Sequence, residues 1–317
     1  MSWRSVEQRL ALGLLFASGL VVVVINLAIF IFIFSESTPL FSESEQRNDM
    51  SLYHDTENEE QFDRTASVFQ PLDNMLGQPV WQPVSDQGLY SLWPLAVGTF
   101  KITIIAVVIA WIFSFFAAIG IAFYLPKSIR YGVKVMIELL AGIPSVVLGF
   151  LGLMFFASYM QDIFGFTYRL NALLCGTVLS LTVIPIMTTL FEDLYSAYPK
   201  DQILAAKSAG LYDYQIIRYI IVPASFGRVL AATMLGFGRC FGETMIVLMC
   251  SGNAAILSLD LASGARSFAA TIGAEMAEVI IGDTHYSILF LIGLILFMVT
   301  FLINYISQLV IKRLTYV

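Results

Sequence analysis

Charged residues are scarce in this chain of 317 residues, where Asp, Glu, Lys and Arg together make up only 13%. Soluble domains carry roughly 25% charged residues. Hydrophobic residues make up 58%, and the mean hydropathy is +0.81. This composition excludes an ordinary water-soluble domain and predicts an all-α membrane protein, whose spanning helices each need about 20 apolar residues.

Motifs of soluble enzymes and of metal sites are also missing. The two histidines, His54 and His285, have no partners at metal-ligand spacing. No G-x-x-x-x-G-K-[ST] loop is present, so we expect that the chain is not an enzyme and hydrolyses no ATP itself. Neither the charge nor any basic-aromatic pattern supports nucleic-acid binding. The cysteines lack C-x-x-C spacing and are typical of small core residues: Cys175, Cys240 and Cys250.

Six segments are apolar and long enough to cross a bilayer. Pro144 and Pro185 interrupt the third and fourth, and membrane helices tolerate proline where neighbours satisfy the freed carbonyl. The apolar run of the first is too long for a signal-peptide core and lacks a small-x-small cleavage site. Residues 1–34 are therefore predicted to be a cytoplasmic N-terminus and a retained anchor. The predicted spans are 10–34, 94–125, 133–160, 171–191, 225–251 and 287–311.

Basic residues predict the orientation of the chain. Lys and Arg concentrate before the first span and after the second, fourth and sixth spans. Cytoplasmic loops of membrane proteins are enriched in these residues. Both termini and the segment after the fourth span are therefore predicted to be cytoplasmic.

Residues 35–91 form an acidic loop that the orientation places outside the cytoplasm. Its acidic residues far outnumber its two arginines, Arg47 and Arg64. Residues 41–65 have few large apolar side chains and are predicted to lack a packed core. Residues 66–91 have more of them, and we expect this part to fold against the bundle. Two interpretations stay open for the loop, a solvated spacer and an interaction surface for an external partner.

A polar helix–turn–helix pattern lies at 204–223, between two apolar segments. Residues 203–209 favour a helix, and Gly210 stands where a helix ends in a left-handed conformation. A second helix is predicted from about Tyr212 to Ile221, and Pro223 is expected to end it. A surface hairpin without a partner is the alternative. One face of the second helix, spaced for insertion into a groove, holds Tyr212, Gln215, Ile216 and Tyr219.

This hairpin resembles the cytoplasmic loop of bacterial ABC-importer permeases, which reads E-A-A-x3-G-x9-I-x-L-P. Leu204 and Val222 replace the usual Glu and Leu. The resemblance runs from about Gly98 to the C-terminus. It implies a type I ABC-importer permease fold over 92–317, in which the loop 192–223 couples to ATP-hydrolysing subunits. The matching residues, all at the family's spacing, are Ala205, Ala206, Gly210, Ile220 and Pro223.

Three further stretches resemble the PstC-type permeases of phosphate-specific (Pst) importers. They are AGIPSVVLG at 141–149, GRCFGETM at 238–245 and TIGAEMAEV at 271–279. The resemblance implies import of inorganic phosphate across a bacterial inner membrane. It also implies a PstA-type permease, a PstB-type ATP-binding dimer and a PstS-type extracytoplasmic binding protein as partners. No cofactor is expected on this chain, because the partner ATPase subunits use ATP and Mg.

The fifth predicted span contains two charges, Arg239 and Glu243, four residues apart and so expected on one helix face. A charge at the bilayer centre costs about 2.5–3.5 kcal/mol on insertion scales, which favours a cavity or a partner. The planar guanidinium of Arg239 suits phosphate oxygens. A purely structural Arg–Glu pair is the alternative. The other predicted pathway residues are Lys101, Thr103, Ser145 and Thr244, with Lys101 either lining the mouth or snorkelling to the interface.

Other functions remain open at this stage. A PstA-type partner, or a permease for another oxyanion, has the same fold. An ATP-independent secondary transporter or an intramembrane enzyme is a different class. No inverted repeat, G-x-S-x-G or H-E-x-x-H motif supports that class.

Overall fold

The computed structural model describes residues 3–42, 79–83 and 89–315. These residues are mostly helical, with irregular segments such as 251–267 and one two-stranded antiparallel sheet in which Trp81 pairs with Tyr90. The elements in chain order are α1 (Trp3–Ser37), α2 (Pro39–Ser42), β1 (Trp81–Gln82), β2 (Leu89–Tyr90), α5 (Leu92–Ile119), the π-helix η2 (Gly120–Tyr124), α6 (Lys127–Ala141), α7 (Ser145–Leu151), the π-helix η3 (Gly152–Phe156), α8 (Ala157–Phe164), α9 (Ala172–Ser196), α10 (Lys200–Ser208), α11 (Asp213–Ile216), the π-helix η4 (Ile217–Ile221), α12 (Val222–Phe241), α13 (Met245–Cys250), α14 (Phe268–Glu275) and α15 (Thr284–Thr315).

Six helical segments in the described residues are long and apolar enough to cross a membrane, which confirms the predicted number. They are Leu12–Ser37, Leu92–Tyr124, Ser145–Phe164, Ala172–Ser196, Asp213–Phe241 and Thr284–Lys312. Most of the acidic loop predicted at 35–91 lies outside the described residues. Its part at 79–83 packs against the bundle, as expected, because Trp81 is only 4% exposed.

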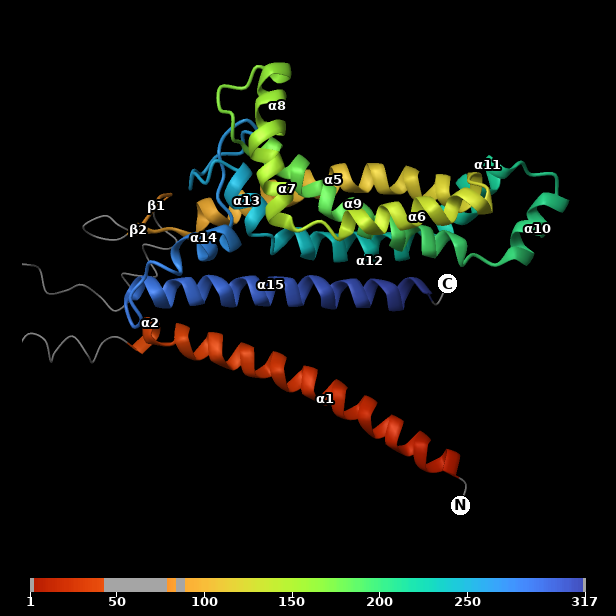
Figure 1. Ribbon diagram of the computed structural model, residues 1–317, viewed down its shortest axis with the longest axis horizontal. Coiled ribbons are helices and arrows are strands. Elements are labelled where there is room, and N and C mark those ends of the chain that lie inside the picture. Colours follow the sequence, from red (N-terminus) through yellow and green to blue (C-terminus); the bar gives the residue numbers. More distant parts are fainter. Residues whose placement is uncertain (1–2, 43–78, 84–88, 316–317) are drawn as a thin grey trace, which may run out of the picture.

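Helices α5, α9, α12 and α15 run lengthwise beside one another (Figure 1). Helix α9 is the most buried of the six spans and lies at the centre of the core, where Leu174, Leu179 and Phe191 are fully enclosed. Helix α1 packs mainly along α15, for example through Phe30 and Phe297, whose ring centroids lie 5.5 Å apart. It diverges from the bundle toward its N-terminus (Figure 1).

The third span differs from the prediction of 133–160. The chain breaks at Gly142–Pro144, so that α6 is a separate helix and the span is Ser145–Phe164. Proline disfavours helical conformation at the residue before it and cannot donate a backbone hydrogen bond. Helix α6 runs along the bundle, whereas α7 and α8 turn steeply away from it (Figure 1). Pro185, in contrast, lies inside the continuous helix α9.

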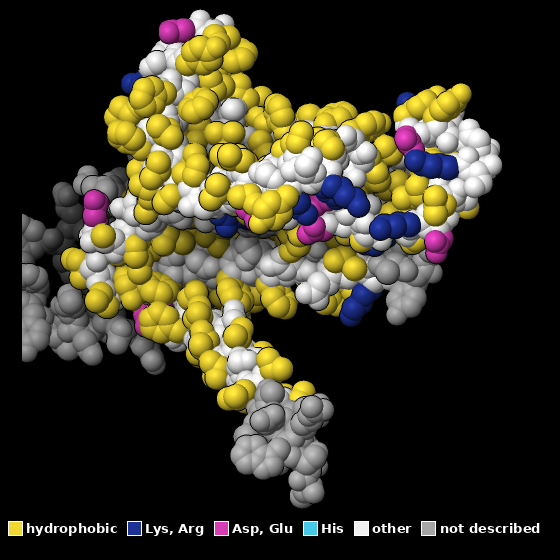
Figure 2. All heavy atoms as spheres, turned by 45° about the vertical axis from the view of Figure 1, so that its right-hand side comes forward, with side chains coloured by type: hydrophobic (Ala, Val, Ile, Leu, Met, Phe, Trp, Pro, Cys, Tyr) yellow, Lys and Arg dark blue, Asp and Glu magenta, His cyan; other side chains and the backbone are white. Residues whose placement is uncertain are grey.

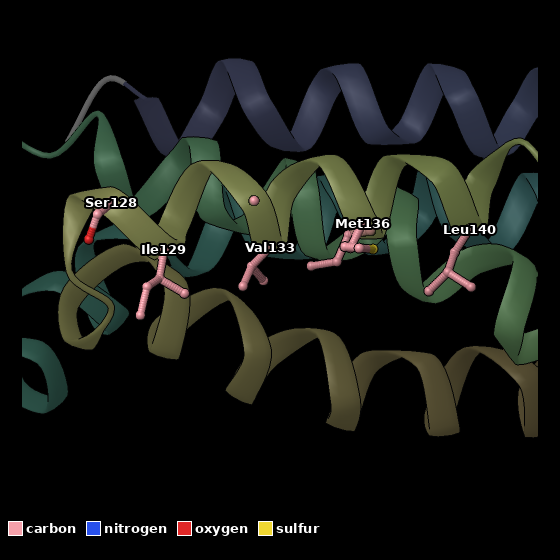
Figure 3. Close-up of a pocket in the computed structure, with 7 residues that line it drawn as sticks. Ser128, Ile129, Val133, Met136 and Leu140 are labelled. Atoms are coloured by element: carbon pink, nitrogen blue, oxygen red, sulfur yellow. The ribbon is translucent and has the colours of Figure 1, made fainter.

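Helix α6 is attached to α9 mainly by charge. Glu192 of α9 is only 1% exposed and forms ion pairs with Arg130 and Lys134 of α6. The neighbouring Asp193 also lies 3.2 Å from the Lys134 Nζ. A groove of about 370 Å³ follows the apolar side of α6 (Figure 3), lined by Ser128, Ile129, Gly132, Val133, Met136, Ile137 and Leu140.

The fifth span also differs from the predicted 225–251. Helices α11, η4 and α12 form one continuous helix, Asp213–Phe241, and the chain breaks at Gly242–Thr244 before α13. The prediction that Pro223 ends the second hairpin helix is therefore wrong. The π-helix η4 ends two residues before Pro223, and such a local change of helical register accommodates the missing donor.

The glycine at position 98 is required by a close backbone approach. A methyl group on Gly98 of α5 would lie 2.2 Å from the carbonyl oxygen of Arg266. The next residue, Thr99, accepts a hydrogen bond from the Phe268 N–H at 3.0 Å. The segment leading into α14 is thus seated directly on the α5 backbone.

We expect Gly98→Ala to destabilise the protein, because the backbone of Arg266 would have to shift. Overpacking of this kind costs about 1–3 kcal/mol. Thermal unfolding of the purified protein in detergent measures the change. Gly120→Ala, at the other end of α5, is the matched control because a methyl group there meets no atom within 4 Å. Equal stability of the two variants would contradict the prediction.

Candidate functional site

The predicted turn at Gly210 is confirmed in the structure. Gly210 has φ +86°, in the left-handed region, and its N–H donates to the Lys207 carbonyl at 2.9 Å while the Leu211 N–H donates to Ala206 at 3.2 Å. These two bonds form a Schellman motif, which closes the last turn of α10. An ion pair of 2.7 Å between Lys207 and Asp213 spans the turn. We call residues 200–216 the coupling hairpin.

The predicted docking face of the hairpin is only partly exposed. Tyr212 and Tyr219 are exposed, but Ile216 is buried in the core of this chain and is not available to a partner. The reason is that α11 continues into the fifth span, so its apolar side packs toward Phe123 and Ile203. The exposed apolar side chains of the hairpin include Leu204, Ala205, Tyr212 and Tyr214, and they stand among exposed polar residues such as Lys207 and Asp213.

The coupling hairpin lies at the same end of the bundle as both chain termini (Figure 1). Lys and Arg side chains also gather over this half of the molecule (Figure 2). Strands β1 and β2 and helix α14 lie at the opposite end (Figure 1). We refer to these as the hairpin end and the opposite end.

Arg239 lies on the last turn of α12, directly before the break at Gly242–Thr244. Its side chain is exposed, and it forms no hydrogen bond or ion pair with the residues that the structure describes. The expected Arg239–Glu243 pair is absent among them, because the helix ends between the two residues and they do not share a face. Glu243 instead accepts a hydrogen bond from the Met245 N–H at 3.2 Å.

Two neighbouring elements line the break. A methyl group on Gly149 would lie 2.9 Å from the Met249 sulfur, and one on Gly152 would lie 2.6 Å from the Cys250 sulfur. Helix α7 and its π-helical extension η3 therefore pack against α13. On another side, Thr244 packs against Gly273 of α14. Of the predicted pathway residues, Glu243 and Thr244 thus lie in the break, Arg239 lies on the last helical turn before it, and Ser145 begins the helix that packs against α13.

Two of the predicted pathway residues lie elsewhere. Thr103 is only 1% exposed and is enclosed within the fold. The Lys101 ammonium donates three hydrogen bonds, to the carbonyl oxygens of Ser258 and Asp260 and to the Ser263 hydroxyl. Because all its N–H groups are used in this way, Lys101 neither binds an anion at the mouth nor snorkels, which corrects the prediction.

A polar cluster at the opposite end was not predicted. Glu275 of α14 forms an ion pair of 2.6 Å with Arg266, and its carboxylate lies 2.9 Å from His285 Nε2. The indole N–H of Trp81 donates to the same carboxylate at 3.1 Å. An acidic residue in the short apolar segment 268–275 indicates that its carboxylate needs polar partners. The partners themselves could not be found, because Trp81 is distant in the sequence.

Comparison with known proteins gives consistent matches. A model of the family "binding-protein-dependent transport system inner membrane component" matches residues 110–316. The chain is 33% identical over 239 residues to the probable ABC transporter permease protein YqgH of Bacillus subtilis, covering 72% of this chain and 75% of that protein. It is 30% identical over 252 residues to the phosphate transport system permease protein PstC of Mesorhizobium japonicum, covering 74% and 76%.

The fold is also similar to a solved structure. The chain superimposes on the inward-facing MetNI methionine ABC transporter with a TM-score of 0.52 and 15% identity, covering 70% of this chain and 97% of that one. At this identity the likeness shows the fold alone. It agrees with the type I permease architecture expected from the hairpin motif.

We expect the stability of the Glu275 cluster to depend on pH. Burial raises the pKa of the Glu275 carboxyl, but the hydrogen bond with His285 and the charge of Arg266 outweigh it, so the pKa lies below its usual range. The cluster therefore stabilises the fold above the ordinary carboxyl pKa, and this contribution is lost as the pH falls through the lowered pKa.

Thermal unfolding measured from about pH 7 to about pH 3 tests this expectation. Glu275→Gln should unfold at a lower temperature at neutral pH and lose much of the acid dependence. The matched control is Glu278→Gln, because Glu278 is exposed on the same segment. If Glu275→Gln keeps the full acid dependence of the wild type, the cluster is not its source.

Proposed function

The chain belongs to the family of binding-protein-dependent transport system inner membrane components, and we propose that it is the permease subunit of an ATP-driven importer for inorganic phosphate. Several relatives that cover about three quarters of this chain are named phosphate transport system permease proteins. On this proposal the chain lies in a bacterial inner membrane, with the hairpin end and both termini in the cytoplasm.

The observation that carries the proposal is the path of the fifth span. One continuous helix of 29 residues, Asp213–Phe241, begins in the coupling hairpin and ends beside the break that follows Arg239. At about 1.5 Å per residue such a helix is on the order of 40 Å long. A displacement of the hairpin therefore moves the Arg239 end of the same rigid element.

Arg239 provides the positive charge and the hydrogen-bond donors that an anion requires. Its guanidinium stays charged at any relevant pH and presents N–H groups in a fork that matches phosphate oxygens. A charge within a spanning helix is costly in lipid. The exposed side chain of Arg239 therefore needs water, an anion or another subunit beside it. Glu243, beside the break, opposes prolonged residence of an anion, which favours release over tight binding.

The proposal includes three kinds of partner. A second, PstA-type permease completes the wall of the pathway on the exposed side of Arg239. A PstB-type ATPase dimer receives the hairpins of the two permeases and uses ATP and Mg, while this chain binds no cofactor. A PstS-type binding protein delivers phosphate at the opposite end. Support for these roles comes from the family and the named relatives.

We expect Arg239→Gln to lower phosphate uptake by about ten- to a hundredfold, because a hydrogen bond to a charged group contributes about 1.5–3 kcal/mol. Uptake is measured in proteoliposomes that contain the whole complex, with sulfate as the competing anion. Arg228→Gln removes the same charge from the same helix, nearer the hairpin, and serves as the control. Wild-type uptake by an assembled Arg239→Gln complex would refute the role. Preference of the wild type for sulfate would refute the cargo.

We expect Gly210→Val to abolish co-purification of the ATPase, because a β-branched residue is strained at a φ of +86°. Gly282→Val, at the opposite end, is a closely matched control. Gly282 has φ +88°, and a methyl group added to either glycine would meet no atom within 4 Å. Equal loss of the ATPase in both variants would show a general folding defect and not a coupling role.

A further inference from the structure

The ammonium of Lys101 occupies a cup of oxygens formed by one short segment. Its Nζ lies 3.0 Å from the Ser258 carbonyl, 2.9 Å from the Asp260 carbonyl and 3.1 Å from the Ser263 hydroxyl. The side chain is only 7% exposed. An ammonium has three N–H donors, and this segment accepts from all of them. Lys101 thus acts on the segment as a tethered cation.

The same segment is held from a second side by α9. The N–H groups of Ala172 and Leu173, at the start of that helix, donate to the carbonyls of Ser263 and Leu261, both at 3.0 Å. Ile256, which precedes the segment, pairs with Val80 in an antiparallel bridge. Residues 257–263 are therefore fixed between two spanning helices, although they contain no regular secondary structure.

The outward face of this segment is apolar. Leu257, Leu259 and Leu261 are 49%, 81% and 45% exposed, and they alternate with Ser258 and Asp260, whose carbonyls face Lys101. The segment lies outside the six spans. The side chain of Asp260 is exposed among the leucines, which disfavours lipid as the covering medium because a carboxylate is costly there.

We propose that Lys101 is a positioning residue, which holds residues 257–263 as a rigid platform on which the extracytoplasmic binding protein docks through the three leucines. The inference rests on the proposed function, because it takes its partner from it. A soluble protein fits the platform, since the leucines stand beside a charged residue at the end opposite the coupling hairpin. A rigid platform also loses little conformational freedom on binding.

The first test measures the platform without any cargo. Hydrogen exchange of the amides in 251–268, and of Ala172 and Leu173, is followed in the purified complex. We expect Lys101→Met, which keeps the packing but removes the cation, to accelerate exchange there by about tenfold or more. Lys127→Ala, a lysine removed from an exposed position, should exchange like the wild type. Unchanged exchange in Lys101→Met would overturn the positioning role.

The second test adds the binding protein. In proteoliposomes, Lys101→Ala should raise the concentration of loaded binding protein needed for half-maximal ATPase activity by about tenfold, with the maximal rate retained. Propylammonium replaces the deleted Cγ, Cδ and Cε atoms and the ammonium, so it should restore both the half-maximal concentration and slow exchange. Propanol, which lacks the charge, should restore neither. Leu259→Ser should raise the same concentration without faster exchange at Ala172 and Leu173.

Two results would overturn the docking role. One is a fall in maximal rate at an unchanged half-maximal concentration, which would make the segment a gate. The other is normal docking in spite of accelerated exchange. Failure of the proposed function itself would look different, because the wild-type complex would then show no ATPase response to a phosphate-loaded binding protein. The exchange measurement would still decide whether Lys101 holds the segment.

Discussion

The continuity of the helix Asp213–Phe241 is the constraint on which the functional arrangement depends. Pro223 lies within it and would normally end a helix, but the π-turn at Ile217–Ile221 lets the chain continue. Had the helix stopped there, the coupling hairpin would be a separate surface element. Because it continues, the hairpin and Arg239 belong to one rigid body. Ile216 and Ile221 fix that body in the core, so it moves together with the helices that pack around it.

The charged side chains within the fold are of two kinds. Some hold helices and segments together, and Arg239 has a proposed functional role. Glu192, Lys101 and Glu275 are each enclosed and each bonded to several partners, so their cost of burial is offset locally. They join α6 to α9, a surface segment to α5, and the β-hairpin to α14 and α15. Arg239 is different, because it is exposed and unpaired among the described residues. It is the charge that an assembled complex, and not the single chain, has to accommodate.

The sequence predicted the number of spans and the glycine turn well, because both depend on local properties. Apolar length identifies a span, and a glycine after an alanine-rich helix identifies a Schellman turn. The prediction of an Arg239–Glu243 pair was wrong because the helix breaks at Gly242. Glu243 therefore does not lie on the helix face that its spacing from Arg239 implies. The prediction that Ile216 belongs to the docking face was wrong for a related reason. Periodicity shows which side of a helix is apolar, but not whether that side meets a partner or the same chain.

Lys101 and Arg239 show the limit of such reasoning most clearly. In the sequence both are single cations within or near an apolar span, and both suggested a route for anions. Their roles differ because of residues that are distant in the chain. The 258–263 segment returns to α5 and uses every donor of Lys101, since Gly98 leaves room for the backbone of Arg266 one turn away. No comparable segment within the described part of the chain returns to Arg239. The donors of Arg239 thus remain available at the end of the helix that begins in the hairpin, and on our proposal this is the position in which a weakly held anion would respond to a movement of the hairpin.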